Sequence, residues 1–269
     1  MITRIAAILL LASSLAVADD AADAGRKVLS RYQDAVVTVK LVVSLSVSLG
    51  ARDQQSESKT EAVGTIIDPS GLTVISLSTI DPSAMMKARM RGQAAELKID
   101  STVKDVKLVL ADGTELPAEV VLRDKDLDVA YVLPVEKPAK PLPAIDLAKS
   151  AKPQVLDEVI CLNRLGKVAN RVVSVSVERI DALVDRPRPF YVLASGGSSG
   201  IGSPVFSTAG LPLGIILIRN TPTDGEANIA SAFSGAGGLG IMPIVLPAAD
   251  LLEDVKQALE AKKPAPEKK

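Results

Sequence analysis

Residues 62–77 read AVGTIIDPSGLTVISL, and this stretch decides the fold. Its outer parts, AVGTII and LTVISL, have the β-branched and apolar composition that is typical of strands. Between them stands DPSG, four residues that favour a tight reversal of the chain. The stretch therefore predicts two neighbouring antiparallel strands joined by a turn.

The sequence on either side of this hairpin also has strand composition. Residues 35–49 (AVVTVKLVVSLSVSL) are rich in β-branched residues and partly alternate, as a half-buried strand should. The polar residues 51–60 (ARDQQSESKT) are expected to form an exposed loop, and residues 81–104 show no clear period. A second hairpin is predicted over residues 106–122, and residues 128–135 (DVAYVLPV) close the first strand-rich half.

The second half of the chain repeats this pattern. Its predicted strands are VLDEVICL (155–162), RVVSVSVERI (171–180), PFYVLA (189–194), PVFS (204–207) and LPLGIILI (211–218). Between the halves, residues 136–152 contain several prolines, which cannot donate backbone hydrogen bonds to a sheet, so we predict a linker there. The whole pattern predicts an all-β protein made of two six-stranded antiparallel β-barrels, with a short helix near each end.

The beginning of the chain has the pattern of a secretory signal peptide. Residues 1–18 combine Arg4, an apolar run and the small residues Ala16-Val17-Ala18, which indicates cleavage before Asp19. We therefore expect an exported protein, periplasmic or extracellular, without a membrane span in its mature form. The expected divisions are 19–135 for the N-terminal segment and first barrel, 136–152 for the linker, 153–248 for the second barrel, 249–261 for the C-terminal helix and 262–269 for a disordered tail.

The composition excludes several kinds of chemistry. The 269 residues include no histidine and one cysteine, Cys161, and 31 basic residues nearly balance 32 acidic ones. Without an imidazole there is neither Ser-His-Asp nor Cys-His catalysis, nor a histidine-ligated metal. We therefore expect no metal and no cofactor, and the balanced charge gives no reason to expect a nucleic-acid partner.

Four motifs resemble the HtrA/Deg type of trypsin-like serine protease. The matching segments are residues 64–80, similar to GSGFIIDPDGYIVTNNHVV; residues 111–124 with Asp128-Val129-Ala130, similar to ADGREFPAKVVGRD with DLA; Pro204, Gly210 and Gly214-Ile215, spaced as in GNSGGPLVNxxGxVIGI; and residues 240–247, similar to GIGFAIPS. The resemblance covers about residues 30–262 and implies a trypsin-like fold of two barrels.

The resemblance also implies where a catalytic triad would stand. Ser78 occupies the position of the histidine, Asp128 that of the aspartate and Ile201 that of the nucleophilic serine. Two of the three groups are therefore absent, and losing even one costs on the order of 10⁴ to 10⁶ in turnover, or about 5 to 8 kcal/mol of barrier. The resemblance implies a degenerate member in which the loop of Ser199, Gly200, Ile201 and Gly202 keeps only backbone donors for a peptide.

Two enzymatic alternatives remain open at this point. The nucleophile could be a neighbouring serine, and a lysine could replace the missing base. The candidate residues are Ser198, Ser199 and Ser203 as nucleophiles, and Lys107, Lys125 and Lys167 as bases. A lysine base must be desolvated to lose its proton near neutral pH, and all three lysines stand beside polar turn residues.

The sequence thus favours an exported, catalytically inactive protease homologue that binds unfolded peptide segments or another protein, alone or in a homo- or hetero-oligomer. The competing hypothesis is a serine endopeptidase with a histidine-free site. Residues 84–95 (AMMKARMRGQAA) are compatible either with a basic amphipathic docking turn or with a surface loop.

Overall fold

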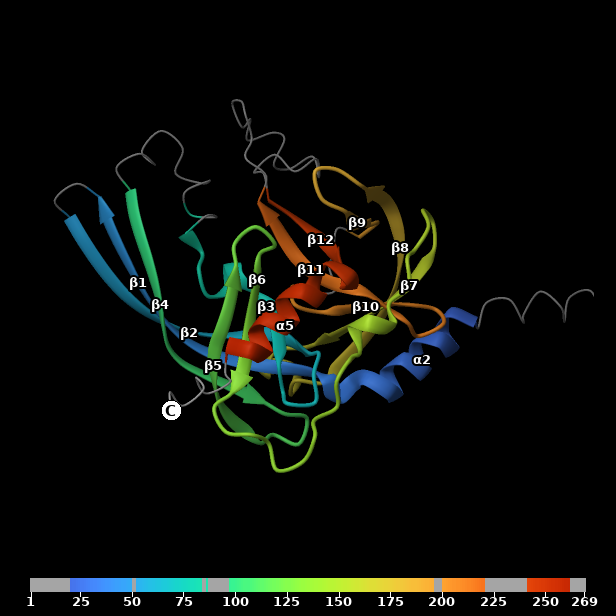
Figure 1. Ribbon diagram of the computed structural model, residues 1–269, viewed down its shortest axis with the longest axis horizontal. Helices are drawn as coiled ribbons and strands as arrows, with labels where there is room; N and C mark the ends of the chain where they lie inside the picture. The colour runs from blue at the N-terminus through green and yellow to red at the C-terminus, as the bar shows by residue number, and fades with distance from the viewer. Residues whose placement is uncertain are drawn as a thin grey trace, which may run out of the picture.

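The computed structural model describes residues 20–49, 52–83, 86, 97–195, 200–220 and 241–261. Strands dominate and close into two barrels (Figure 1). The first barrel has the order β1-β2-β3-β6-β5-β4 and the second the order β10-β11-β12-β9-β8-β7, with antiparallel pairs in both. The predicted all-β class with two six-stranded antiparallel barrels is therefore confirmed.

The strands divide evenly between the two barrels. The first barrel contains β1 (Val36–Leu49), β2 (Arg52–Ile66), β3 (Thr73–Ser76), β4 (Leu97–Val109), β5 (Glu115–Asp124) and β6 (Val129–Pro134). The second contains β7 (Glu158–Arg164), β8 (Val173–Val184), β9 (Phe190–Leu193), β10 (Pro204–Ser207), β11 (Pro212–Asn220) and β12 (Ile241–Pro247). Their inward side chains, mostly Val, Ile and Leu, form the buried core.

The hairpin predicted from residues 62–77 forms between β2 and β3. Its turn is closed by the Gly71 N–H, which donates to the Asp68 carbonyl at 2.9 Å, and by the Ile67 N–H, which donates to the Leu72 carbonyl at 2.8 Å. Gly71 has a φ of +91°, a left-handed conformation that glycine adopts without a Cβ clash. The turn residues thus act as the sequence predicts.

The polar stretch 51–60 was expected to be a loop, and for residues 52–60 this expectation is wrong. These residues belong to β2 and pair with β1 in an unbroken register. Residues 97–104, for which the sequence shows no clear period, belong to β4 and also pair with β1. Together the three strands continue beyond the barrel as a ribbon (Figure 1). Residues 54–59 are all exposed, so no core face imposes the apolar alternation that marks most strands.

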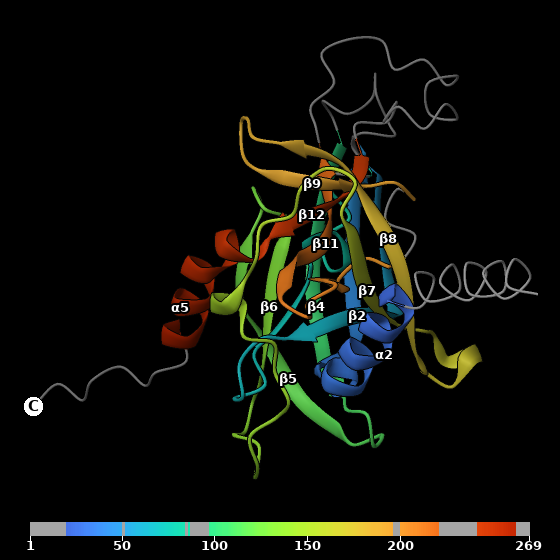
Figure 2. The same ribbon diagram turned by 90° about the vertical axis from the view of Figure 1, so that its right-hand side faces the viewer.

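Each end of the described chain forms a helix, and each helix packs on the barrel that is farther from it in the sequence, an arrangement called crosswise packing below. Helix α2 (Asp20–Tyr32) precedes the first barrel in sequence but packs on β7 and β8 of the second. Helix α5 (Leu252–Ala261) follows the second barrel but packs on β5 of the first. Figure 2 shows the two helices on opposite sides of the molecule. The expected helix at 249–261 therefore begins three residues later, after the 3₁₀ turn η5 (Ala248–Leu251).

Aromatic and polar contacts anchor these helices. The rings of Tyr32 and Phe206 stack with centroids 4.7 Å apart, which joins the end of α2 to β10. In α5, Asp254 accepts a hydrogen bond of 3.4 Å from the hydroxyl of Tyr131 in β6. Within the described residues, no helix is long and apolar enough to cross a membrane.

The predicted linker separates β6 from β7 and contains one 3₁₀ turn, η3 (Leu147–Lys149). It is packed on the first barrel, because the buried Ile145 donates its N–H to the Ile66 carbonyl at 2.9 Å. Strand β7 begins later than predicted, at Glu158. Leu156 has a φ of +71°, which interrupts extended backbone before the strand.

Candidate functional site

A buried carboxylate and two serines lie where β3 ends and β6 begins. Ser76 is the last residue of β3, Ser78 lies in the 3₁₀ turn η2 (Leu77–Thr79), and Asp128 directly precedes β6. The Ser76 hydroxyl donates to Asp128 Oδ2 at 2.5 Å, and the Ser78 hydroxyl donates to Asp128 Oδ1 at 2.9 Å. The Ser78 N–H also donates to Oδ1 at 2.9 Å. The structure thus places Ser78 and Asp128 in direct contact, as the alignment of the histidine and aspartate positions implies.

The same carboxylate binds the second barrel. The Ile218 N–H of β11 donates to Asp128 Oδ2 at 3.1 Å. Burial raises the pKa of the Asp128 carboxyl above its ordinary value, and the hydrogen bonds from Ser76, Ser78 and Ile218 offset part of this rise. Asp128 therefore receives four donors, and it joins the two barrels.

The loop that precedes β10 is fixed by close backbone contacts. Gly202 has a φ of +93°, and a Cβ built on it would lie 2.1 Å from the Val63 carbonyl oxygen of β2. Its N–H donates to the Ile216 carbonyl at 2.7 Å, and its carbonyl accepts from the Thr65 hydroxyl at 2.7 Å. Only glycine fits here, so the backbone of this loop is held against both barrels.

Strand β11 brings the loop and the carboxylate to one place. Both backbone groups of Ile216 are used by the loop, since its N–H also donates to the Ser203 carbonyl at 2.8 Å. Ile218, whose N–H binds Asp128, is two residues further along. Alternate residues direct their backbone groups to the same strand edge and are about 7 Å apart. Asp128, with Ser78 bound to it, and the loop that contains Ile201 therefore both contact β11, at positions two residues apart along the strand. This region is the junction between the barrels.

Ser199 of the predicted peptide-binding loop lies outside the described residues, as does Ser198, one of the candidate nucleophiles. Of the rest, the Gly202 N–H is used within the fold and cannot serve an incoming peptide. Ile201 is half-buried and packs against the core of the second barrel, and within the described chain its amide has no hydrogen-bond partner. Among the described residues of this loop, Gly200 and Ile201 are thus the two whose N–H groups remain as donors.

The structure also places the residues of the enzymatic alternatives. Ser203 is fully buried and donates its hydroxyl to Asn163 Oδ1 at 3.2 Å, so it is not presented to a substrate. Lys107 contacts Glu115 at 3.4 Å on the first barrel, while Lys125 and Lys167 are exposed. Among the described residues, no group of acidic or cysteine side chains could hold a metal ion.

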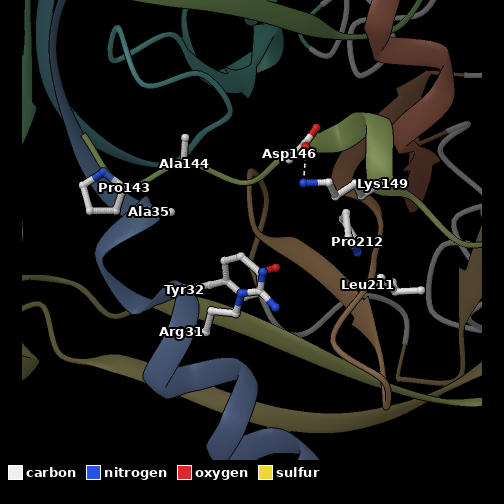
Figure 3. Close-up of a pocket in the computed structure, with 9 residues that line it drawn as sticks. All are labelled: Arg31, Tyr32, Ala35, Pro143, Ala144, Asp146, Lys149, Leu211 and Pro212. Carbon is white, nitrogen blue, oxygen red and sulfur yellow. Dashed lines mark ion pairs between the residues drawn. The ribbon is translucent and has the colours of Figure 1, made fainter. Parts of the chain in front are cut away.

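One cavity lies at this junction and another lies away from it. One of about 100 Å³ is lined by Asp128 and Ile218 of the site and by Lys125, Arg188 and Arg219. Another of about 230 Å³ lies between the end of α2, the linker and the start of β11 (Figure 3). It holds the exposed Asp146–Lys149 ion pair but shares no lining residue with the junction. The smaller cavity is therefore the one that belongs to the candidate site.

Several residues of this site were not identified from the sequence. Ser76 and Thr65 contribute buried hydroxyls, Asn163 supports Ser203, and Ile218 contributes a backbone N–H. The only sequence signal was the position of Ser76, two residues before Ser78 at the end of an apolar strand. The backbone donor and the contacts between barrels carry no signature in side-chain type.

Two closed six-stranded barrels, with an acidic residue and a glycine-bounded loop at their junction, define the class of trypsin-like proteins. A comparison with family models agrees, since residues 64–215 match the trypsin-like peptidase domain. The match spans more than half of the chain, and the chain therefore belongs to this family. A comparison with curated proteins gave no significant match.

Proposed function

We propose that this protein is an exported, non-catalytic member of the trypsin-like family, of the HtrA/Deg type, that binds extended peptide or protein segments at the junction of its barrels. The proposal rests on the hydrogen bonds of Asp128. The chain contains no histidine, and the Asp128 carboxylate instead accepts hydrogen bonds from Ser76, Ser78 and Ile218. The four matching motifs and their order support the HtrA/Deg type.

Hydrolysis by this route needs a base next to a nucleophile. A serine hydroxyl attacks a carbonyl only when a neighbouring group accepts its proton. The position of the nucleophile holds Ile201, and the carboxylate of Asp128 accepts hydrogen bonds from two serines that lie on its own barrel. The cluster therefore orients no base toward the loop.

The loop keeps features that a peptide ligand could use, although the groups needed for hydrolysis are missing. The Gly202 contacts hold the loop in one shape, and the Ile201 N–H is left as a donor within the described chain. Extended peptides commonly bind by adding main-chain hydrogen bonds to such an edge, with side chains in adjacent pockets. The cavity of about 100 Å³ beside Asp128 has the size of one side chain. These features support binding without turnover.

The proposal is tested with the chain from Asp19 onward, because we expect cleavage before that residue. Unfolded casein should remain intact from about pH 5 to about pH 9, a range that covers the titration of the usual catalytic bases. A fluorophosphonate probe, which reacts with activated serines, should not label the protein. Labelling that disappears on Ser199→Ala or Ser203→Ala would show an active nucleophile and establish the histidine-free endopeptidase instead.

Binding is measured by fluorescence anisotropy with a set of labelled extended peptides. Ile201→Arg places a charge beside the loop, where it is costly to desolvate, and should weaken binding by about tenfold. Leu211→Arg is the matched control, because Leu211 is an exposed apolar residue that lines the other cavity. Equal affinity of both variants for the peptides would contradict a ligand site at this loop.

A further inference from the structure

The outer edge of β2 lacks a partner strand over most of its length. β2 pairs with β1 from Arg52 to Thr65, but it pairs with β3 only at Thr65 and Ile66. Within the described residues, the other edge of this strand is thus unpaired before Thr65. The side chains of residues 54–59 are all exposed, so no other described part of the chain covers them.

Such an edge presents a row of backbone donors and acceptors that can pair with another strand. Proteins usually protect exposed edges with bulges, prolines or charged side chains. The ribbon's other edge, β4, has this protection, because its register shifts opposite Val42 and Val43 and leaves the exposed Lys104 as an extra residue. The edge of β2 has neither a bulge nor a proline, since its pairing with β1 is regular and residues 54–62 contain no proline. Its charged residues, Glu57, Lys59 and Glu61, alternate in sign, so they do not repel every second copy.

We propose that the β2 edge is a self-association surface, at which the β2 strands of two copies pair antiparallel about a two-fold axis at Ser58. The usable edge ends at Ala62, because the next residue, Val63, meets the loop at Gly202. A symmetric pairing over residues 54–62 is centred on Ser58. It would join the two ribbons into one continuous sheet, and it does not depend on the function proposed above.

The charges on β2 favour this register. In an antiparallel pair, residues directly opposite each other point to the same face and interact. With Ser58 on the axis, Glu57 of each copy lies opposite Lys59 of the other, which gives two attractive pairs. A shift of the axis to residue 57 would place Glu57 against itself, and a shift to residue 59 would place Lys59 against itself. Like charges in these positions destabilise both neighbouring registers.

The proposal is tested by exchanging the charges. Sedimentation velocity of the chain from Asp19 onward, from about 10 μM to about 1 mM, should show a monomer–dimer equilibrium in the range of weak interfaces. Glu57→Lys alone, and Lys59→Glu alone, should each raise the dimer dissociation constant by roughly tenfold to thirtyfold, because each replaces two attractive pairs with repulsive ones. The double variant Glu57→Lys with Lys59→Glu should restore the parental constant.

Lys104→Glu is the control, since it reverses an exposed charge on the opposite edge of the ribbon and should leave the constant unchanged. Thermal melts of all variants show whether the monomer is intact. A monomer at every concentration would overturn the proposal. So would a dimer that is indifferent to the single changes, or single changes that the double variant fails to rescue, because pairing about Ser58 requires that rescue.

Discussion

Replacing Asp128 with alanine should weaken the connection between the two barrels. The change leaves the N–H groups of Ser78 and Ile218 without their acceptor, whereas the Ser76 hydroxyl keeps the Ser78 hydroxyl as a partner at 2.8 Å. Each unsatisfied buried group costs about 1 to 3 kcal/mol, and alanine at the left-handed φ of +57° adds about 1 kcal/mol. Removal of a carboxylate from a buried site offsets part of this cost. We expect a net loss of about 2 to 4 kcal/mol in the free energy of unfolding.

Thermal and urea unfolding measure this loss, which corresponds to a decrease in Tm of roughly 5 to 15 °C for a protein of this size. Asp128→Asn should be less harmful, because asparagine tolerates the left-handed conformation and keeps one acceptor oxygen. Asp126→Ala is the control, since the Asp126 side chain is 80% exposed and pairs only at 3.6 Å with Arg188. If Asp128→Ala is no more destabilising than Asp126→Ala, the carboxylate does not hold the barrels together as described.

Three further outcomes test other parts of the structure. Gly202→Ala should lower the free energy of unfolding, measured by calorimetry, by more than about 3 kcal/mol, because its Cβ would clash with the Val63 carbonyl. Gly113→Ala is the control, since Gly113 also has a positive φ but an added Cβ there would have nothing within 4 Å, and it should cost only about 1 to 2 kcal/mol. Equal losses in the two variants would refute the close contact at Gly202. Tyr32→Ala removes the stack on Phe206 and should cost about 3 to 5 kcal/mol in urea unfolding. Tyr32→Phe should retain most of the stability, because the hydroxyl of Tyr32 makes only a long contact of 3.5 Å with the Gly210 carbonyl. A large loss in the phenylalanine variant would contradict this. Burial raises the pKa of Asp254, so the stability that this carboxyl contributes is fully present below its unfolded pKa of about 3.9 and is lost as the pH rises through the folded pKa. In urea titrations, Asp254→Asn should therefore be more stable than the parent protein at pH 7, and the difference should vanish near pH 3. An advantage of the asparagine variant that grows toward acid would show that the pKa shift has the opposite sign.

The sequence predicts the barrels well where local chemistry and burial agree. The turn DPSG and its apolar flanks define a hairpin by themselves, and the structure has it. The polar half of β2 could not be predicted in this way, because its side chains are exposed on both faces of a ribbon and carry no period. Its strand conformation comes from pairing with β1, which is a tertiary effect.

The candidate site shows the same division. The contact between Ser78 and Asp128 follows from aligning two motifs that stand fifty residues apart, and the structure contains it. The contribution of Ile218 could not be predicted, since a backbone N–H is present in almost every residue type and only the docking of the barrels brings it to Asp128. The burial of Ser203 is likewise visible only in three dimensions.

The crosswise packing of the terminal helices has a consequence for the order in which the molecule can assemble. Helix α2 is near the start of the chain, yet the strands that cover its apolar face, β7 and β8, lie more than a hundred residues later. During synthesis its docking face must wait until the first two strands of the second barrel have been made, and α5 packs on the first barrel only when translation is nearly complete. Contacts between such distant segments slow folding, because long loops must close before the contacts form. Neither barrel can therefore acquire all of its native contacts independently, and a truncation at either end leaves the opposite barrel uncovered.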